Sequence, residues 1–101
     1  MIVLHAKVPI NPENRDEALE LAETLVEHTN EEEGVIDYRA AIDLQDENTI
    51  RFFEQYEDAA AFGAHFETDH YQAFEQQIPE YLTGIPELVK FDVSGATELD
   101  P

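Results

Sequence analysis

The chain contains no cysteine and no tryptophan, and it carries very little positive charge. Without cysteine it can form neither a disulfide nor a thiolate nucleophile, so both are excluded. Only five residues are lysine or arginine against 24 aspartates and glutamates, and the formal net charge is −19. Five cations cannot supply the basic surface that phosphate recognition needs. Binding to nucleic acid or to an anionic membrane surface is therefore excluded.

Long apolar runs are also missing. No stretch is long enough to cross a bilayer or to act as a signal peptide, so we expect a soluble, cytoplasmic protein. Hydrophobic residues still make up 43% of the chain, which argues against disorder. A chain of 101 residues has room for one hydrophobic core. We therefore expect a single domain over residues 1–101, with a polar tail at 94–101 that either frays or crosses to a neighbouring subunit.

The acidic residues are spread along the whole chain instead of being collected in a tail. This pattern is typical of halophilic proteins, from salt-loving microorganisms, in which high salt screens the repulsion within so charged a fold. The alternative is an ordinary acidic protein of the cytosol. In either case the charge is informative about the salt conditions in which the protein works, and it says little about the reaction at its site.

Alternation of apolar and polar residues predicts four strands, at residues 2–8, 35–44, 49–56 and 88–93. Between the first two strands, Asn11 and Pro12 form a favoured helix start. Apolar side chains then recur on one helical face as far as Asn30. After the third strand, Asp58 and Thr68 are the expected N-caps of two short helices.

The order strand, helix, strand, strand, helix, strand indicates an α+β fold. For a chain of this length it favours a ferredoxin-like βαββαβ sandwich, with a four-stranded antiparallel sheet and the helices on one face. The other face is then bare, and an apolar face of that size needs a cover. Two sheets packed face to face in a homodimer would supply it. The expected occupants of this face are Phe53 or Phe52, Val35 or Ile36, and Phe91 or Leu88.

Several segments resemble a known family in order and spacing. Residues 32–38 (EEGVIDY) are similar to the E-P-G-x-x-x-Y element of the antibiotic biosynthesis monooxygenase family, which includes quinol monooxygenase-like proteins. Residues 53–56 (FEQY) and 65–74 (HFETDHYQAF) resemble its E-x-[WY] and H-x-x-[ST]-x-H-x-x-x-F elements. Residues 15–17 (RDE) fall where family members often carry R-x-E. The similarity covers nearly the whole chain.

The resemblance implies a dimeric α+β barrel with a largely apolar pocket between sheet and helices in each subunit. Family enzymes oxygenate phenols, quinols or polycyclic aromatics with molecular oxygen, without a metal, flavin or haem. It thus implies an oxidoreductase that needs no cofactor and whose partners are a small aromatic substrate and O2. Such chemistry requires a base that deprotonates an electron-rich aromatic, in a site that excludes water.

Two departures from the family pattern stand out. Glu33 replaces the proline of the E-P-G element, in what we expect to be an exposed turn. Tyr56 stands where many members carry tryptophan. Haem-degrading enzymes of this fold rely on tryptophan and asparagine, so that branch is disfavoured.

The predicted catalytic residues are His65, Glu54 and Tyr38. His65 is a suitable base near neutral pH, or else it ties a helix to a strand by bonding a backbone carbonyl or Glu54. Glu54, in a mainly apolar strand, is expected either to have a raised pKa or to pair with Arg39 or Arg51. Tyr38 either directs its hydroxyl at the substrate or fills the core.

Six more residues are expected to bind the substrate, and packing in the core is the alternative for each of them. These are Tyr56, Phe52, Phe62, Phe66, His70 and Phe74. No metal site is expected, because His65 and His70 are five residues apart and do not share a helical face. No third ligand has a recognisable spacing.

The cations lie mainly on the predicted strands, as Lys7, Arg39, Arg51 and Lys90. We interpret them as partners in buried or interface ion pairs with Asp37, Asp43 or Asp92, and a clamp for an anionic substrate is the alternative.

The leading hypothesis is a cofactor-independent monooxygenase that oxidises a phenol or quinol. The second is a non-catalytic dimeric barrel that binds a small hydrophobic ligand or a partner protein. A third is another small-molecule enzyme, such as an isomerase or a decarboxylase.

Overall fold

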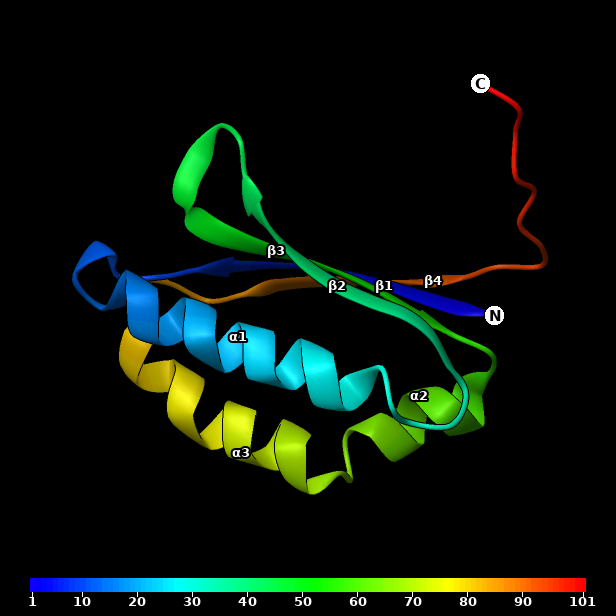
Figure 1. Cartoon of the computed structure of the whole chain (residues 1–101), viewed down its shortest axis with the longest axis horizontal. Helices are drawn as coiled ribbons and strands as arrows, with labels where there is room; N and C mark the ends of the chain where they lie inside the picture. Colours follow the sequence, from blue (N-terminus) through cyan, green and yellow to red (C-terminus); the bar gives the residue numbers. More distant parts are fainter.

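A sheet and three α-helices form two layers in the computed structural model, which describes all 101 residues (Figure 1). The strands are β1 (Ile2–Pro9), β2 (Val35–Asp43), β3 (Asp46–Tyr56) and β4 (Glu87–Asp92). The helices are α1 (Arg15–Thr29), α2 (Ala59–His65) and α3 (Asp69–Gln77), with short 3-10 turns η1 (Pro12–Asn14) and η2 (Ile78–Tyr81). All the helices lie on the same side of the sheet, as Figure 1 shows.

The four strands pair in the order β2-β3-β1-β4, and every pairing is antiparallel. This confirms the predicted ferredoxin-like α+β fold. The β2–β3 hairpin is tighter than predicted, because β3 begins at Asp46 instead of Thr49. The order leaves β4 at one edge of the sheet, with β1 as its single neighbour.

Side chains alternate between the two faces of the sheet, as the period of a strand requires. In β1 every second residue from Ile2 is buried toward the helices. In β3 the same face carries a set that the sequence predicted to lie together: Ile50, Phe52, Glu54 and Tyr56. The helix α1 covers this face with small and apolar side chains: Ala18, Ala22 and Leu25.

The helix caps follow local sequence. Asp58 accepts a hydrogen bond from the N–H of Ala61, and Thr68 accepts one from the N–H of Tyr71, so both predicted N-caps are confirmed. The start of the first helix differs. Asn11 is an N-cap, as predicted, but the turn that it caps is the 3-10 turn η1. The helix α1 begins only at Arg15.

Gly34 fixes the turn before β2 against α2. Its φ of +88° is a conformation that residues with a side chain rarely adopt. A Cβ at this position would lie 2.6 Å from Cβ of Ala61, and the carbonyl of Gly34 accepts a 2.8 Å bond from the N–H of Glu57. A residue larger than glycine therefore cannot fit here without movement of the backbone or of α2.

The face of the sheet away from the helices carries exposed aromatic side chains. Phe53 is 37% exposed and Phe91 is 48% exposed, and both rings pack edge-on against His5. Of the expected alternatives, these are the two phenylalanines that lie on this face. Val35 does not lie there, because the β2–β3 register shifts between Val35 and Asp37, and Val35 packs against the core.

The cations on strands pair with carboxylates, and for Arg39, Arg51 and Lys90 the partner is one of the predicted aspartates. Arg39 bonds Asp37 at 2.8 Å and Arg51 bonds Asp43 at 2.9 Å. Lys90 lies 3.9 Å from Asp92, and Lys7 lies 3.7 Å from Glu87. The pairs are not buried within the single chain, since all four cations keep a large part of their side chains in solvent, and pairing at an interface stays a prediction. Exposed pairs of this kind contribute little stability each, about 0.2–1 kcal/mol.

The start of β1 and the end of β4 lie side by side, because the two strands are antiparallel. The N–H of Val93 donates to the carbonyl of Met1, and residues 94–101 then run away from the body without regular structure (Figure 1). No helix is both long enough and apolar enough to span a membrane.

Candidate functional site

An apolar cavity of about 340 Å³ lies between the helix-facing side of the sheet and the helices α2 and α3. Aromatic rings from β3 and from the helices form much of its wall: Phe52, Phe62, Phe66 and Phe74. Leu82, Pro86 and Leu88 line it at the β4 edge, and Leu88 is 64% exposed. The cavity therefore reaches solvent at the edge of the sheet.

Few polar side chains reach this cavity. They are Tyr38, Glu54, Tyr71 and Glu75. Glu54 is 5% exposed and is the one buried carboxylate in the protein. A carboxylate in an apolar environment is typical of groups that take or give a proton.

Burial raises the pKa of Glu54 to about 7, although hydrogen bonds from Tyr56 and Tyr38 act in the opposite direction and Glu32 adds a smaller upward effect. The Tyr56 hydroxyl donates to Oε1 of Glu54 at 2.7 Å. The alternative expectation, that Glu54 pairs with an arginine, is wrong. Arg39 is opposite Phe53 in the register, so it lies on the other face of the sheet.

The tyrosines around Glu54 act as hydrogen-bond donors. Burial, followed by the charge of Glu54, raises the pKa of Tyr38 and Tyr56 far above the usual range. Burial also raises the pKa of Tyr71 to about 12. All three hydroxyls therefore keep their protons at neutral pH and can stabilise a negative charge in or beside the cavity.

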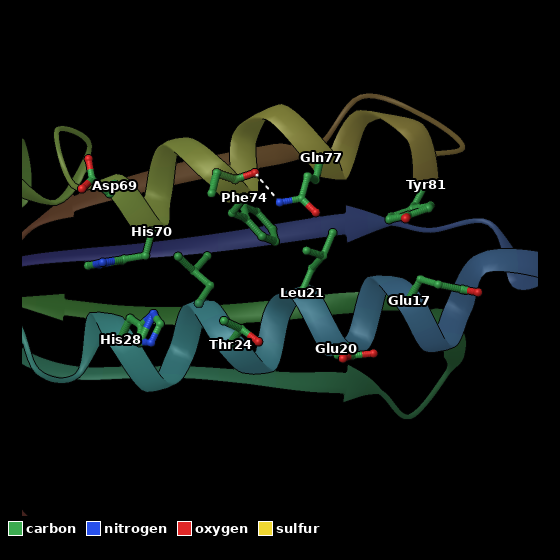
Figure 2. Close-up of a pocket in the computed structure, with 12 residues that line it drawn as sticks. Glu17, Glu20, Leu21, Thr24, His28, Asp69, His70, Phe74, Gln77 and Tyr81 are labelled. Atoms are coloured by element: carbon green, nitrogen blue, oxygen red, sulfur yellow. Dashed lines mark hydrogen bonds between the residues drawn. The ribbon is translucent and has the colours of Figure 1, made fainter.

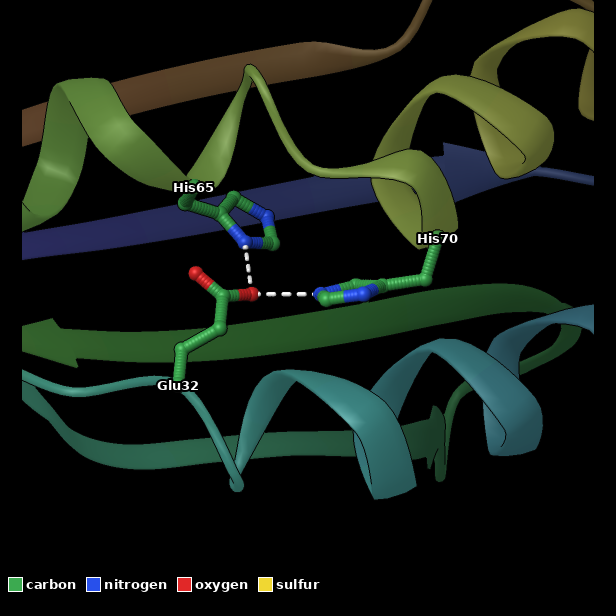
Figure 3. A group of neighbouring side chains, drawn as sticks. All are labelled: Glu32, His65 and His70. Atoms are coloured by element: carbon green, nitrogen blue, oxygen red, sulfur yellow. Dashed lines mark hydrogen bonds and ion pairs between the residues drawn. The ribbon is translucent and has the colours of Figure 1, made fainter.

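His65 and His70 share one carboxylate oxygen (Figure 3). Oε2 of Glu32 lies 2.8 Å from Nδ1 of His65 and 2.6 Å from Nε2 of His70. Because an ionised carboxylate only accepts hydrogen bonds, both ring nitrogens donate to it. The side chain of His65 is fully buried, and its Nε2 has no hydrogen-bond partner. Burial lowers the pKa of His65, while the bond to Glu32 acts against this.

Most of the predicted site residues line the cavity: Tyr38, Phe52, Glu54, Phe62, Phe66 and Phe74. Tyr56, His65 and His70 do not. The ring of His65 packs behind the wall, with its centroid 5.3 Å from that of Tyr38 and 5.0 Å from that of Tyr71. A proton-handling role for His65 stays a prediction. The hydrogen bond that ties it in place goes to Glu32, and not to Glu54 or to a backbone carbonyl as expected.

The sequence interpretation gave no role to Glu75, which lines the cavity, or to Glu32, which bonds His65 and His70 outside it. Glu32 is the first residue of the EEG motif. The sequence could not indicate its contacts, because its partners lie 33 and 38 positions away. Glu75 lies on α3 beside Phe74 and had no distinguishing pattern.

A second hollow, of about 620 Å³, lies in the groove between α1 and α3 (Figure 2). His28 and His70 lie at one end of it, with ring centroids 5.7 Å apart, and Glu17 and Tyr81 lie at the other. Its lining includes the charged side chains of Glu17, Glu20 and Asp69 and no buried carboxylate. It is therefore a less suitable place for a flat aromatic molecule.

The fold and the cavity define a class: small α+β proteins in which helices on one face of an antiparallel sheet enclose an apolar site. Within that class, the model of the family described as "Antibiotic biosynthesis monooxygenase" matches residues 1–77. The chain belongs to this family, as its sequence motifs predicted.

Individual relatives support the same assignment. A Bacillus subtilis (strain 168) protein named "Putative monooxygenase YcnE" is 37% identical over 94 residues, which cover 93% of this chain and 99% of that protein. A crystal structure of an antibiotic biosynthesis monooxygenase superposes with a TM-score of 0.88 at 28% identity, covering 94% of this chain and 100% of the other. A conserved protein from Methanosarcina mazei Go1 superposes with a TM-score of 0.85 at 28% identity, covering 89% of each chain.

Proposed function

We propose that this protein is a monooxygenase that oxidises a phenol or quinol with molecular oxygen, and that Glu54 accepts the substrate proton. The observation that supports this most directly is a buried carboxylate with a pKa raised to about 7, facing an otherwise apolar cavity. A base is most effective when its pKa is close to the working pH. Glu54 meets that condition.

The cavity suits a small, flat and largely neutral substrate. Its volume of about 340 Å³ lies at the lower end of the usual range for ligand sites. The rings of Phe52, Phe66 and Phe74 offer aromatic faces and edges for stacking. Glu54 and the hydroxyl of Tyr38 then orient the hydroxyl group of the substrate.

The reaction begins with transfer of the substrate hydroxyl proton to Glu54. The phenolate gives one electron to O2, and the resulting radical pair combines to form a carbon–oxygen bond at a ring carbon that carries hydrogen, para to the oxygen in a phenol and ortho to it in a quinol. The peroxide anion takes the proton back from Glu54 and becomes a hydroperoxide. Its outer O–H and the hydrogen on the same ring carbon then leave together as water. One oxygen atom of O2 ends in the quinone carbonyl and the other in water, so atoms and electrons balance.

Proton transfer to Glu54 does not change the net charge of the cavity. The negative charge moves from the carboxylate to the substrate, which remains within reach of the tyrosine hydroxyls. This matters in a protein with a net charge of −19, because an additional buried anion would be strongly disfavoured. His65, behind Tyr38 and Tyr71, positions those two rings in this scheme.

Oxygen uptake tests the proposal, with a panel of para-unsubstituted phenols and of quinols that have a hydrogen on the carbon beside a hydroxyl. Glu54→Gln keeps the shape of the side chain but removes the base, so turnover should fall by about 10²-fold or more. Glu80→Gln is the matched control, because Glu80 is exposed and does not line the cavity, and it should retain turnover. If no member of the panel drives uptake while one binds tightly, the chain is a binding module instead.

We also propose that two copies pair through the open face of the sheet. Phe53, Phe91 and Val89 leave apolar surface exposed around His5 on this face. The paired cations Lys7, Arg39 and Arg51 lie on the same face, so it carries less net negative charge than the remaining surface. Two highly acidic copies would repel each other least here.

A further inference from the structure

We propose that Glu32, His65 and His70 form a binding site for a divalent transition metal ion such as Zn²⁺. The three side chains converge on one point, as Figure 3 shows, and their ligand atoms all lie within 4.8 Å of one another. Two imidazoles and one carboxylate are a ligand set that Zn²⁺ uses in proteins. This site is separate from the cavity and does not depend on the proposed function.

The backbone presents these ligands from three different segments. Glu32 lies in the turn between α1 and β2, His65 is the last residue of α2, and His70 lies in the first turn of α3. The sequence argument against a site assumed that the two histidines would have to share a helical face. Because a turn separates α2 from α3, the rings approach each other from different helices, and their centroids are 6.2 Å apart.

The distances between the three ligand atoms must change when a metal ion binds. Oε2 of Glu32 is 2.8 Å and 2.6 Å from the two ring nitrogens, which are hydrogen-bond distances. Around a tetrahedral ion with bonds of about 2.0–2.1 Å, ligand atoms are roughly 3.3 Å apart. The carboxylate must therefore withdraw by about half an ångström, and Glu32 lies in a turn that permits this. The two ring nitrogens, which are at most 4.8 Å apart, must also reach that separation, and rotation of the partly exposed His70 ring can bring them there.

An ion can reach the site from solvent. The side chain of His70 is 21% exposed and that of Glu32 is 12% exposed, whereas His65 forms the closed inner wall. His70 also faces the groove between α1 and α3, together with His28 and Asp69 (Figure 2). A net charge of −19 raises the concentration of divalent cations near the whole surface.

Metal binding at Nδ1 of His65 has a specific signature. In the metal-free protein the bond to Glu32 favours the tautomer with the ring proton on this nitrogen, and Nε2, which has no partner, is then unprotonated. Coordination reverses the tautomer, so the ring proton moves to Nε2. Nitrogen–proton NMR correlations of the His65 ring distinguish the two tautomers, and they report on this site alone.

The experiment is a calorimetric titration of the full chain with ZnCl2, in the presence of millimolar Mg²⁺. Mg²⁺ prefers oxygen ligands and should occupy surface carboxylates without occupying a site with two imidazoles. We expect one Zn²⁺ per chain and the tautomer change at His65. His70→Ala and Glu32→Gln should each weaken binding at least about 10-fold, since even the outer partners of metal ligands carry effects of that size.

His5→Ala is the matched control, because His5 lies on the open face of the sheet and should leave zinc affinity unchanged. Circular dichroism establishes that each variant is folded, and the NMR readout on the unsubstituted chain needs no variant. Zinc binding that Mg²⁺ abolishes, that His70→Ala leaves intact, or that does not change the His65 tautomer would overturn the site. Oxygen uptake plays no part in these outcomes.

Discussion

Tyr56 and Glu54 are two residues apart on the same face of β3, and the hydroxyl of Tyr56 donates a 2.7 Å hydrogen bond to Oε1 of Glu54. Tyr56 is fully buried, so this bond has no competition from water. It holds the carboxylate at the cavity and counteracts part of the rise in the pKa of Glu54 that burial causes. The Tyr56–Glu54 pair therefore sets both the position and the basicity of the proposed proton acceptor.

The pH dependence of turnover follows from this pair. Because Glu54 must be ionised to accept a proton and its pKa is about 7, kcat/KM for oxygen uptake should rise with pH and level off above that value. Tyr56→Phe removes a hydrogen bond that favours the ionised form, so the rise should move to higher pH. Tyr81→Phe, in the groove between α1 and α3, should not move it. A profile that is flat between pH 5 and 9 would contradict the role of Glu54.

Stability should depend on pH in a direction that is unusual for a carboxyl group. The pKa of Glu54 rises from its ordinary value of 4.5 in the unfolded chain to about 7 in the folded protein, so the folded state binds more protons between these values. The stabilising contribution is complete below pH 4.5 and is lost as pH rises through 7, by up to about 3 kcal/mol. Urea unfolding of the unsubstituted chain and of Glu54→Gln at several pH values measures the difference. The difference should shift in favour of the variant as pH rises, and a constant difference would be the contrary result.

Two glycines offer an internal comparison. Gly34→Ala should lower the free energy of unfolding by about 1–3 kcal/mol, because the new Cβ would meet Ala61 and the backbone has positive φ. Gly63 lies within α2 with nothing within 4 Å of a Cβ, so Gly63→Ala should stabilise the protein by about 0.5–1 kcal/mol. Urea denaturation of both variants tests the pair. Equal effects would mean that the turn moves freely away from α2.

The proposed dimer should depend on Phe91. Phe91→Glu places a charge among Phe53, Val89 and His5 on the open face, and should shift the protein from dimer to monomer. Leu44→Glu is the control, because Leu44 lies fully exposed at the β2–β3 turn. Analytical ultracentrifugation measures both. A monomer without any substitution would refute the dimer directly.

Salt should stabilise this protein. Each lysine or arginine on a strand already has a carboxylate partner, so Arg15, which donates to the carbonyl of Glu47, is the one cation left to offset the other acids. Screening of their repulsion should outweigh the loss of a few exposed ion pairs. Tm should rise between 0.1 and 2 M KCl, and equally in NaCl. A fall in Tm would argue against the halophilic interpretation.

The strands, the helix caps and the parity of β3 were readable from the sequence, because each depends on residues that are close in the chain. Alternation placed Phe52, Glu54 and Tyr56 on one face, and the side chains of Asp58 and Thr68 cap the helices that follow them. Local rules of this kind determine the elements, and their order then determines the sheet.

The sequence could not predict which of the buried residues line the cavity and which lie in the packed interior. Tyr56 and Glu54 have the same parity, yet Glu54 lines the cavity and Tyr56 does not, since the outcome depends on where α2 and α3 lie above the sheet. The junction of Glu32 with His65 and His70 joins three segments across a turn, and no spacing in the sequence encodes it. Likewise the register shift after Val35 moved one residue from the open face to the core.

The peripheral position of β4 gives the protein an entrance that can change independently of its framework. Leu88 and the preceding Pro86 border the cavity while remaining outside the buried cluster formed by β1, β3 and α1. Substitutions at Pro86 or Leu88 can change the shape of the cavity opening without disturbing the packing of the buried cluster. Under the proposed function, selectivity can therefore be adjusted at the β4 edge, by evolution or by engineering, separately from the buried core.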